Sequence, residues 1–102
     1  MRFDHIAVNV KNIEASTQWY VDNLSGQILY QDDTWALLKC FDCKIALTLK
    51  KQHPPHICFE INEETRHEKF KDKNFRQHRD GSSSCYMRDL DGNIIEYLLW
   101  KN

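Results

Sequence analysis

The sequence carries almost no net charge and no long apolar run. Lysine and arginine total 14 residues and aspartate and glutamate total 15, so the formal net charge is −1. Such a balance provides no electrostatic field to attract nucleic acid or an anionic membrane surface. Apolar stretches such as IIEYLLW are far too short to span a bilayer, and the opening MRFDHIAV lacks the apolar core of a signal peptide. We therefore expect a cytoplasmic protein that binds neither nucleic acid nor membrane.

A second CxxC pair is also missing. The chain has four cysteines, and without a secretion signal we expect them to be reduced thiols. Cys40 and Cys43 form the motif CFDC, but no second pair accompanies it and no helix start follows it, as a zinc or redox site of known type would require. A structural zinc protein built on CFDC is kept as an alternative, which predicts that both cysteines are indispensable for folding.

The first half of the chain predicts one helix among four strands. With 102 residues, 41% of them hydrophobic, the chain is long enough for one domain with a single core. Alternating side chains over residues 2–10 predict a half-buried strand. Asn12 is a suitable N-cap for a helix that Ser25 and Gly26 would end. Three extended segments follow, near 27–31, 34–40 and 44–50, which gives the order β-α-β-β-β.

The same order recurs after the two prolines at positions 54 and 55, which break the chain. HICFEI begins 51 residues after the similar HIAVNV, which is half the length of the chain, and this self-similarity indicates a duplicated unit. We therefore predict module 1 over residues 2–50 and module 2 over residues 55–102, combining around one shared concave face. Within module 2 we expect a strand at 56–61, a helix over NEETRHEKFKDK capped by Asn62, a loop at 73–83, and strands near 83–88 and 93–100 joined by an LDGN turn.

Both repeated strands begin with a histidine, His5 and His56. Glu96 is the only charge in the apolar strand IIEYLLW, and burying a carboxylate without a partner is costly. Each residue alone has a simpler explanation, as a hydrogen-bonded histidine or as a glutamate paired with an arginine. Together, two imidazoles and a carboxylate on three strands match a facial metal triad with open coordination positions. The sequence thus predicts metal ligands at His5, His56 and Glu96.

Three segments together resemble the vicinal oxygen chelate superfamily, also called the glyoxalase, bleomycin-resistance and dioxygenase family: DHIAVNVKNIEASTQWYVDNL, HICFEI and YMRDLDGNIIEYL. The resemblance spans nearly the whole chain. It implies an α+β, glyoxalase-like fold in which paired β-α-β-β-β modules form a curved mixed sheet around a metal-binding cleft, often completed by a homodimer. It also places His5, His56 and Glu96 on the family's ligand positions for a divalent metal ion. Fe(II) or Mn(II) is favoured, and Zn(II) or Ni(II) is also compatible.

The resemblance distinguishes among the reactions of the family. The fourth ligand position falls on Ala46, which cannot ligate, and this argues against a glyoxalase-type lyase and against the related isomerisations. HRDGSSSCYMRDLDGNIIE resembles the extradiol dioxygenase signature, with His78 matching the proton shuttle and Tyr86 the hydrogen-bond partner of the substrate. It departs from that signature at Cys85 and Leu90. We therefore predict a small metal-dependent enzyme with extradiol-dioxygenase-like chemistry on a vicinal-oxygen small molecule.

Three alternatives within the family stay open: a thiol transferase, a glyoxalase-type lyase despite Ala46, and a metal-free ligand-binding protein. The segment from Arg76 onward also resembles the phosphonate loop of fosfomycin-resistance thiol transferases, with Arg76, Ser84 and Tyr86 at phosphonate-facing positions, although Ala7 replaces the expected Thr or Cys. A metal-free ligand-binding protein of the bleomycin-resistance type would typically lack the three ligands. Trp35 is expected to line an apolar substrate pocket. Small size and exposed sheet edges indicate a homodimer.

Overall fold

The structure is a computed structural model that describes residues 1–100 and divides into two compact units. The N-terminal unit comprises His5–His56, and the C-terminal unit comprises Met1–Asp4 together with the chain from Ile57 onward. Each unit contains one helix and belongs to the α+β class, as predicted. Neither helix of residues 1–100 has the length and apolar character needed to cross a membrane.

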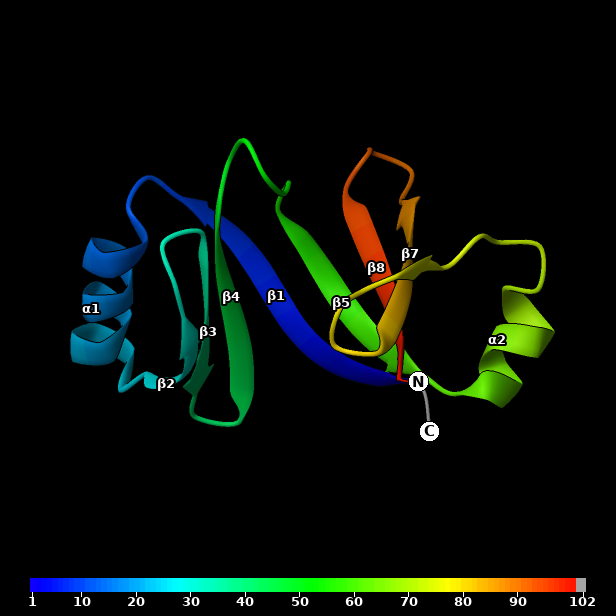
Figure 1. Ribbon diagram of the computed structural model, residues 1–102, viewed down its shortest axis with the longest axis horizontal. Coiled ribbons are helices and arrows are strands. Elements are labelled where there is room, and N and C mark those ends of the chain that lie inside the picture. Colours follow the sequence, from blue (N-terminus) through cyan, green and yellow to red (C-terminus); the bar gives the residue numbers. More distant parts are fainter. Residues whose placement is uncertain (101–102) are drawn as a thin grey trace. The chain divides into compact units, whose positions relative to one another are not determined.

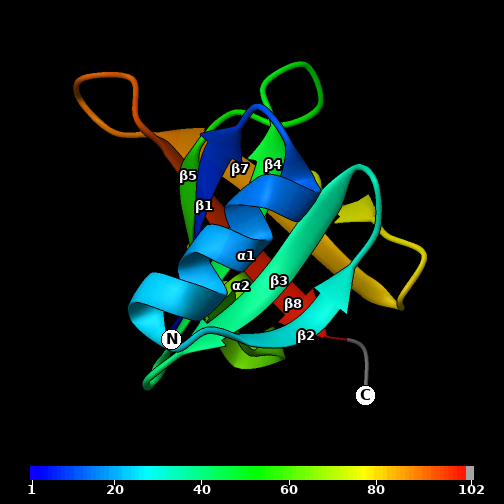
Figure 2. The same ribbon diagram turned by 90° about the vertical axis from the view of Figure 1, so that its left-hand side faces the viewer.

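The N-terminal unit follows the predicted order β-α-β-β-β. Its sheet has the strand order β2-β3-β4-β1; β1 runs parallel to β4, and the other two neighbouring pairs are antiparallel. Helix α1 covers one face of this sheet (Figures 1 and 2). The bounds are β1 (Arg2–Val10), α1 (Ile13–Leu24), β2 (Gln27–Gln31), β3 (Trp35–Cys40) and β4 (Cys43–Leu49). The core under the helix consists of Ile13, Ala36, Leu38, Cys40 and Leu47.

Helix α1 begins and ends at the predicted residues. The Asn12 side-chain oxygen accepts a hydrogen bond from the Ala15 amide at 2.8 Å, which satisfies one of the unpaired donors of the first turn. Ser25 is the left-handed residue at the C-terminal end, with φ of 53°. The Gly26 amide then donates to the Tyr20 carbonyl at 3.2 Å, and a Cβ on Gly26 would lie only 3.2 Å from that oxygen. This close approach explains why glycine follows the serine.

The C-terminal unit has the strand order β5-β8-β7-β6. Its bounds are β5 (His56–Ile61, of which His56 belongs to the other unit), α2 (Glu63–Lys69), β6 (Arg76–Gln77), β7 (Ser82–Arg88) and β8 (Ile94–Trp100). Ile61, Phe70, Cys85 and Leu99 form its buried cluster. The first residues of β1 also belong here, because Arg2 forms an ion pair with Glu60 and the Phe3 ring packs edge-on against Phe59 at 5.7 Å.

Two predictions in the C-terminal unit were wrong in extent. The helix expected over residues 62–73 has the predicted cap, Asn62, but ends at Phe70, whose backbone has φ of −128°. Phe70 is only 7% exposed and contacts the Tyr97 ring at 4.5 Å, so burial of this ring favours an early end over further helical turns. The segment 73–83, expected to be a loop, contains β6, which pairs with Ser83 and Ser84.

The LDGN turn forms as predicted between β7 and β8. The Asp89 carboxylate accepts hydrogen bonds from the Asp91 and Asn93 amides, and these contacts hold the pKa of Asp89 below its usual value, the Asn93 contacts contributing most. Gly92 has φ of 89°, a conformation that glycine adopts without strain. None of the four cysteines forms a disulfide, so they are reduced thiols, as predicted. Among residues 1–100, neither cysteine of CFDC belongs to a cluster of three potential metal ligands.

Candidate functional site

His5 and His56 lie next to each other in the N-terminal unit. Their ring centroids are 5.5 Å apart with an interplanar angle of 72°, and a ring nitrogen of each lies within 4.8 Å of the other. His5 is half-buried on β1, and His56 is only 8% exposed at the first position of β5. The two repeated histidines of the sequence therefore come together, although 51 positions separate them.

The protonation of His56 follows from its neighbour. Its Nδ1 lies 3.0 Å from the Pro54 carbonyl oxygen, and a carbonyl can only accept a hydrogen bond, so Nδ1 carries the proton. Nε2 then presents the lone pair that a metal ion would take, and such a carbonyl contact is the usual way of orienting a metal-binding histidine. The sequence indicates only a chain break at Pro54, and this contact was not predicted from it. Two imidazole nitrogens at this separation fit Fe(II), Mn(II), Zn(II) or Ni(II).

The sheet face that carries His5 is lined by small residues. Ala7 follows His5 by two positions and so shares its face, and Ala7 pairs in register with Ala46 on β4. These alanines are 1% and 5% exposed. Ala46 is the position at which the family resemblance implies a fourth ligand, and its methyl group provides no donor atom.

Glu96 lies in the C-terminal unit on β8 and is 6% exposed, so its predicted burial is confirmed. It pairs in register with Tyr86 on β7, and the Tyr86 hydroxyl donates a hydrogen bond to Glu96 Oε2 at 3.2 Å. Burial, together with the negative charge of Glu96, raises the pKa of Tyr86 to about 12. Tyr86 is therefore a neutral hydrogen-bond donor at physiological pH.

A buried serine links Tyr86 to His78. His78 Nε2 lies 2.7 Å from the Ser84 hydroxyl oxygen, and Ser84 also hydrogen-bonds to Tyr86, an interaction that opposes the rise in the Tyr86 pKa. The sequence predicted these residues separately and missed the link. The signal was the spacing of two between Ser84 and Tyr86, which places both on one face of β7.

The two remaining predicted site residues have exposed positions. Arg76 lies on β6 and pairs in register with Ser84, so it belongs to the same part of the C-terminal unit as His78. Trp35 begins β3 in the N-terminal unit. Its ring packs against the Tyr30 ring, and the two ring centroids are 4.8 Å apart. Sequence analysis did not select Tyr30.

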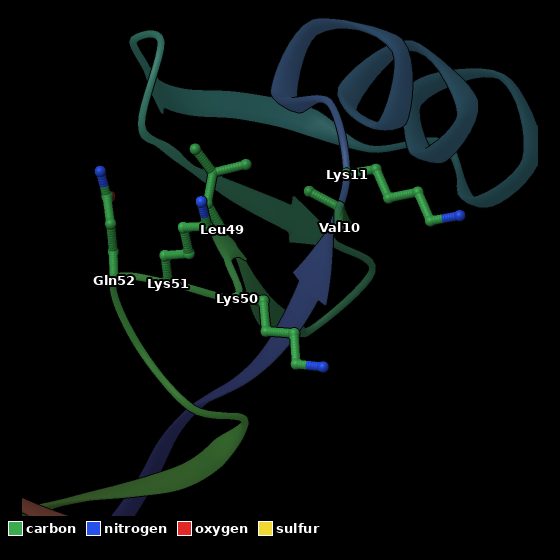
Figure 3. A pocket seen from close by; sticks show the side chains of 6 residues that line it. All are labelled: Val10, Lys11, Leu49, Lys50, Lys51 and Gln52. Carbon is green, nitrogen blue, oxygen red and sulfur yellow. The ribbon is translucent and has the colours of Figure 1, made fainter.

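A surface pocket in the N-terminal unit contains none of these residues. It lies where β1 and β4 end and is lined by Val10, Lys11, Leu49, Lys50, Lys51 and Gln52 (Figure 3). The three lysine ammonium groups point in different directions (Figure 3), so they do not converge on a common anion site.

The protein is similar to several solved structures. A variant of the Streptomyces coelicolor methylmalonyl-CoA epimerase, in complex with 2-nitronate-propionyl-CoA, has a TM-score of 0.76 and 16% identity, with 100% of this chain and 99% of that chain covered. The Mycobacterium tuberculosis methylmalonyl-CoA epimerase has a TM-score of 0.73 and 14% identity over 99% and 89% of the two chains. A glyoxalase/bleomycin resistance protein/dioxygenase superfamily member from Vibrio splendidus has a TM-score of 0.67 and 13% identity over 93% and 96%.

Identities this low establish the fold alone, and it is the predicted glyoxalase-like fold. No curated protein matches the sequence. The family profile, however, matches residues 2–97, which is nearly the whole chain and includes His5, His56 and Glu96. The chain therefore belongs to the Glyoxalase/Bleomycin resistance protein/Dioxygenase superfamily.

Proposed function

We propose that the protein is a metal-dependent enzyme that acts on a small molecule with two vicinal oxygens, by extradiol-dioxygenase-like oxygenation. The observation that carries this proposal is the His5–His56 pair, in which two imidazole nitrogens lie within 4.8 Å and the Pro54 carbonyl sets the tautomer of His56. In the proposal Glu96 is the third ligand. A divalent cation would offset the cost of burying its carboxylate.

The metal and the ligands have separate roles. A bound Fe(II) or Mn(II) would supply open coordination positions for the two substrate oxygens and for dioxygen. Two neutral imidazoles and one carboxylate leave a net positive charge at a divalent ion, which favours an anionic, deprotonated substrate oxygen. Zn(II) or Ni(II) in the same ligands would favour a reaction without oxidation.

Three hydrogen-bonded residues of the C-terminal unit, His78, Ser84 and Tyr86, would transfer the proton of the substrate. His78 is half-buried, and imidazole is the side chain used most often for proton transfer near neutral pH. Its contact with Ser84, and that of Ser84 with Tyr86, provide a path of hydrogen bonds from His78 to the Tyr86 hydroxyl. Tyr86 would hold the substrate oxygen, because its raised pKa keeps it a donor. Arg76, Ser84 and Trp35 are proposed substrate contacts.

A thiol transferase of the fosfomycin-resistance type is the second candidate. The specific observation in its favour is the register pair of Arg76 with Ser84, which places a cationic and a hydroxyl side chain on the same face of neighbouring strands; phosphonate binding uses such a combination. Ala7 is the observation against it, because a buried methyl group stands where that branch has a hydroxyl or thiol. We propose a cytoplasmic homodimer in either case.

Oxygen consumption tests the first candidate. The protein is loaded with Fe(II) under anaerobic conditions and mixed with catechol and air-saturated buffer in an oxygen electrode. We expect equimolar uptake of oxygen and catechol, abolished in Glu96→Ala and retained in His67→Ala, a control histidine that is exposed on α2. Equal uptake in wild type and Glu96→Ala would contradict the proposal. Conjugation of a thiol to an epoxide phosphonate, without oxygen uptake, would favour the second candidate.

A further inference from the structure

Strand β2 contains an irregularity that redirects one aromatic side chain. Ile28 pairs with Leu38, but Tyr30 pairs with Leu37, so one extra residue is inserted in β2 between Ile28 and Tyr30. Leu38 belongs to the core under α1. In a regular strand without a bulge, Tyr30 would share the face of Ile28 and point toward that helix. The bulge instead turns Tyr30 to the opposite face, and bulges of this kind often re-aim a side chain next to an active site.

That opposite face is the one that carries His5. Residues paired across neighbouring strands share a face, and the pairs Tyr30–Leu37, Leu37–Ala46 and Ala46–Ala7 form one row across the four strands. His5 lies two positions before Ala7 on β1 and therefore projects from the same face. Between Tyr30 and His5 the row contains Leu37 and the two buried alanines, Ala46 and Ala7, so it is apolar and has little side-chain bulk.

Trp35 adds a second ring to this face. It lies two positions before Leu37, and its ring is tilted by 31° from that of Tyr30, with centroids 4.8 Å apart. Both aromatic residues are substantially exposed, Tyr30 at 44% and Trp35 at 37%. An exposed aromatic pair beside such an apolar row is typical of a surface that binds a planar apolar group.

One aspartate contacts both aromatic residues, at the Tyr30 side chain and at the Trp35 backbone. Asp32 Oδ2 accepts a hydrogen bond from the Tyr30 hydroxyl at 2.6 Å, and Oδ1 accepts one from the Trp35 amide at 3.0 Å. Oδ1 also accepts from the Thr34 amide and hydroxyl, and these contacts, led by that of Tyr30, hold the pKa of Asp32 well below its usual value. Because the Tyr30 ring is held by its hydroxyl before a ligand arrives, binding against it costs less conformational entropy.

We infer that Tyr30 and Trp35 form an aromatic platform for a planar apolar group of the substrate, at a distance from its vicinal oxygens. Neighbouring strands lie about 4.8 Å apart, so β3 is about 10 Å and β2 about 14 Å from β1. A single catechol ring bound at His5 does not reach that far. The inference rests on the proposed function and narrows the substrate to an elongated molecule in which a second ring extends from the vicinal-oxygen group.

The platform can be tested by measuring the binding of two ligands by calorimetric titration under anaerobic conditions. Catechol and 4-phenylcatechol share the chelating group, and only the second carries an additional ring. We expect Tyr30→Ala and Trp35→Ala each to raise the Kd of 4-phenylcatechol about tenfold and to change that of catechol less than about twofold. Tyr30→Phe keeps the ring and should have a smaller effect. Trp19→Ala, an exposed tryptophan on α1, is the matched control and should have none.

A third ligand shows whether the aromatic platform exists independently of the proposed metal-dependent function. 4-Hydroxybiphenyl carries two rings but cannot chelate a metal. If it binds metal-free protein and loses affinity in Trp35→Ala, the platform is supported even where catechol never binds and the metal proposal fails. If it binds wild type and Trp35→Ala equally, or if the preference for 4-phenylcatechol over catechol survives both alanine variants, the platform is refuted, whatever the metal dependence of catechol binding.

Discussion

Replacing Tyr86 with phenylalanine tests the electrostatics of the candidate site. The raised pKa of Tyr86, about 12 against an ordinary value of 10, means that the folded protein holds this proton more tightly than the unfolded chain does. Stability from the hydroxyl is therefore fully present below pH 10 and is lost as the pH rises toward 12. For a fully buried group this difference in pKa corresponds to about 2.7 kcal/mol. Because Tyr86 is 41% exposed, solvent screening reduces the expected contribution to about 1 kcal/mol.

Urea unfolding of wild type and Tyr86→Phe between pH 8 and about pH 12 measures this contribution. We expect the variant to be less stable by about 1 kcal/mol at pH 8, because Glu96 loses its hydrogen-bond donor. The two unfolding free energies should converge as the pH rises above 10, since the wild-type contribution disappears. Ultraviolet titration of the phenolate should show that the variant lacks one ionisation near pH 12. A difference in stability that is constant with pH, or a missing ionisation near pH 10, would refute the assigned environment of Tyr86.

Three further outcomes follow from local features. Asn12→Ala should lower the free energy of unfolding by about 1 kcal/mol, measured by urea titration, because the first turn of α1 loses its cap; no change would contradict the assigned cap. In the native protein only Cys43 should react rapidly with a thiol reagent, and the three buried cysteines should react after unfolding; rapid reaction of a second thiol would contradict their burial. Ala46→Glu should lower the stability of metal-free protein by about 2 kcal/mol, and Mn(II) should raise the melting temperature of this variant more than that of wild type. Equal metal effects on the two proteins would show that position 46 does not face the metal.

The parts of the fold that were predicted correctly depend on local sequence. Asn12 and Gly26 set the ends of α1 through contacts within a few residues, and the LDGN turn closes on itself. The end of α2 was not predictable in this way. It depends on burial of Phe70 among side chains that are distant in the sequence, such as Cys85 and Leu99. Strand β6 has only two residues and is defined by its partner strand, so no periodic pattern could indicate it.

The candidate site, too, was predicted only where the signal lies in the local sequence. The repeated strand starts predicted that His5 and His56 belong together, and their rings do meet. The roles of Pro54 and Ser84 were missed, because a carbonyl contact and a serine link depend on side-chain geometry that the sequence does not specify. Tyr30 was missed for a different reason: one inserted residue in β2 reverses the face that simple alternation assigns to it.

The metal content of the purified protein tests the central claim most directly. The protein is purified anaerobically without added metal, and its metals are measured by mass spectrometry beside His56→Ala, Glu96→Ala and the exposed control His67→Ala. We expect about one iron or manganese ion per chain in wild type and in His67→Ala, and almost none in the other two variants. A wild-type protein that holds no metal and takes up none on titration would contradict the account, as would His56→Ala and Glu96→Ala variants that retain the metal.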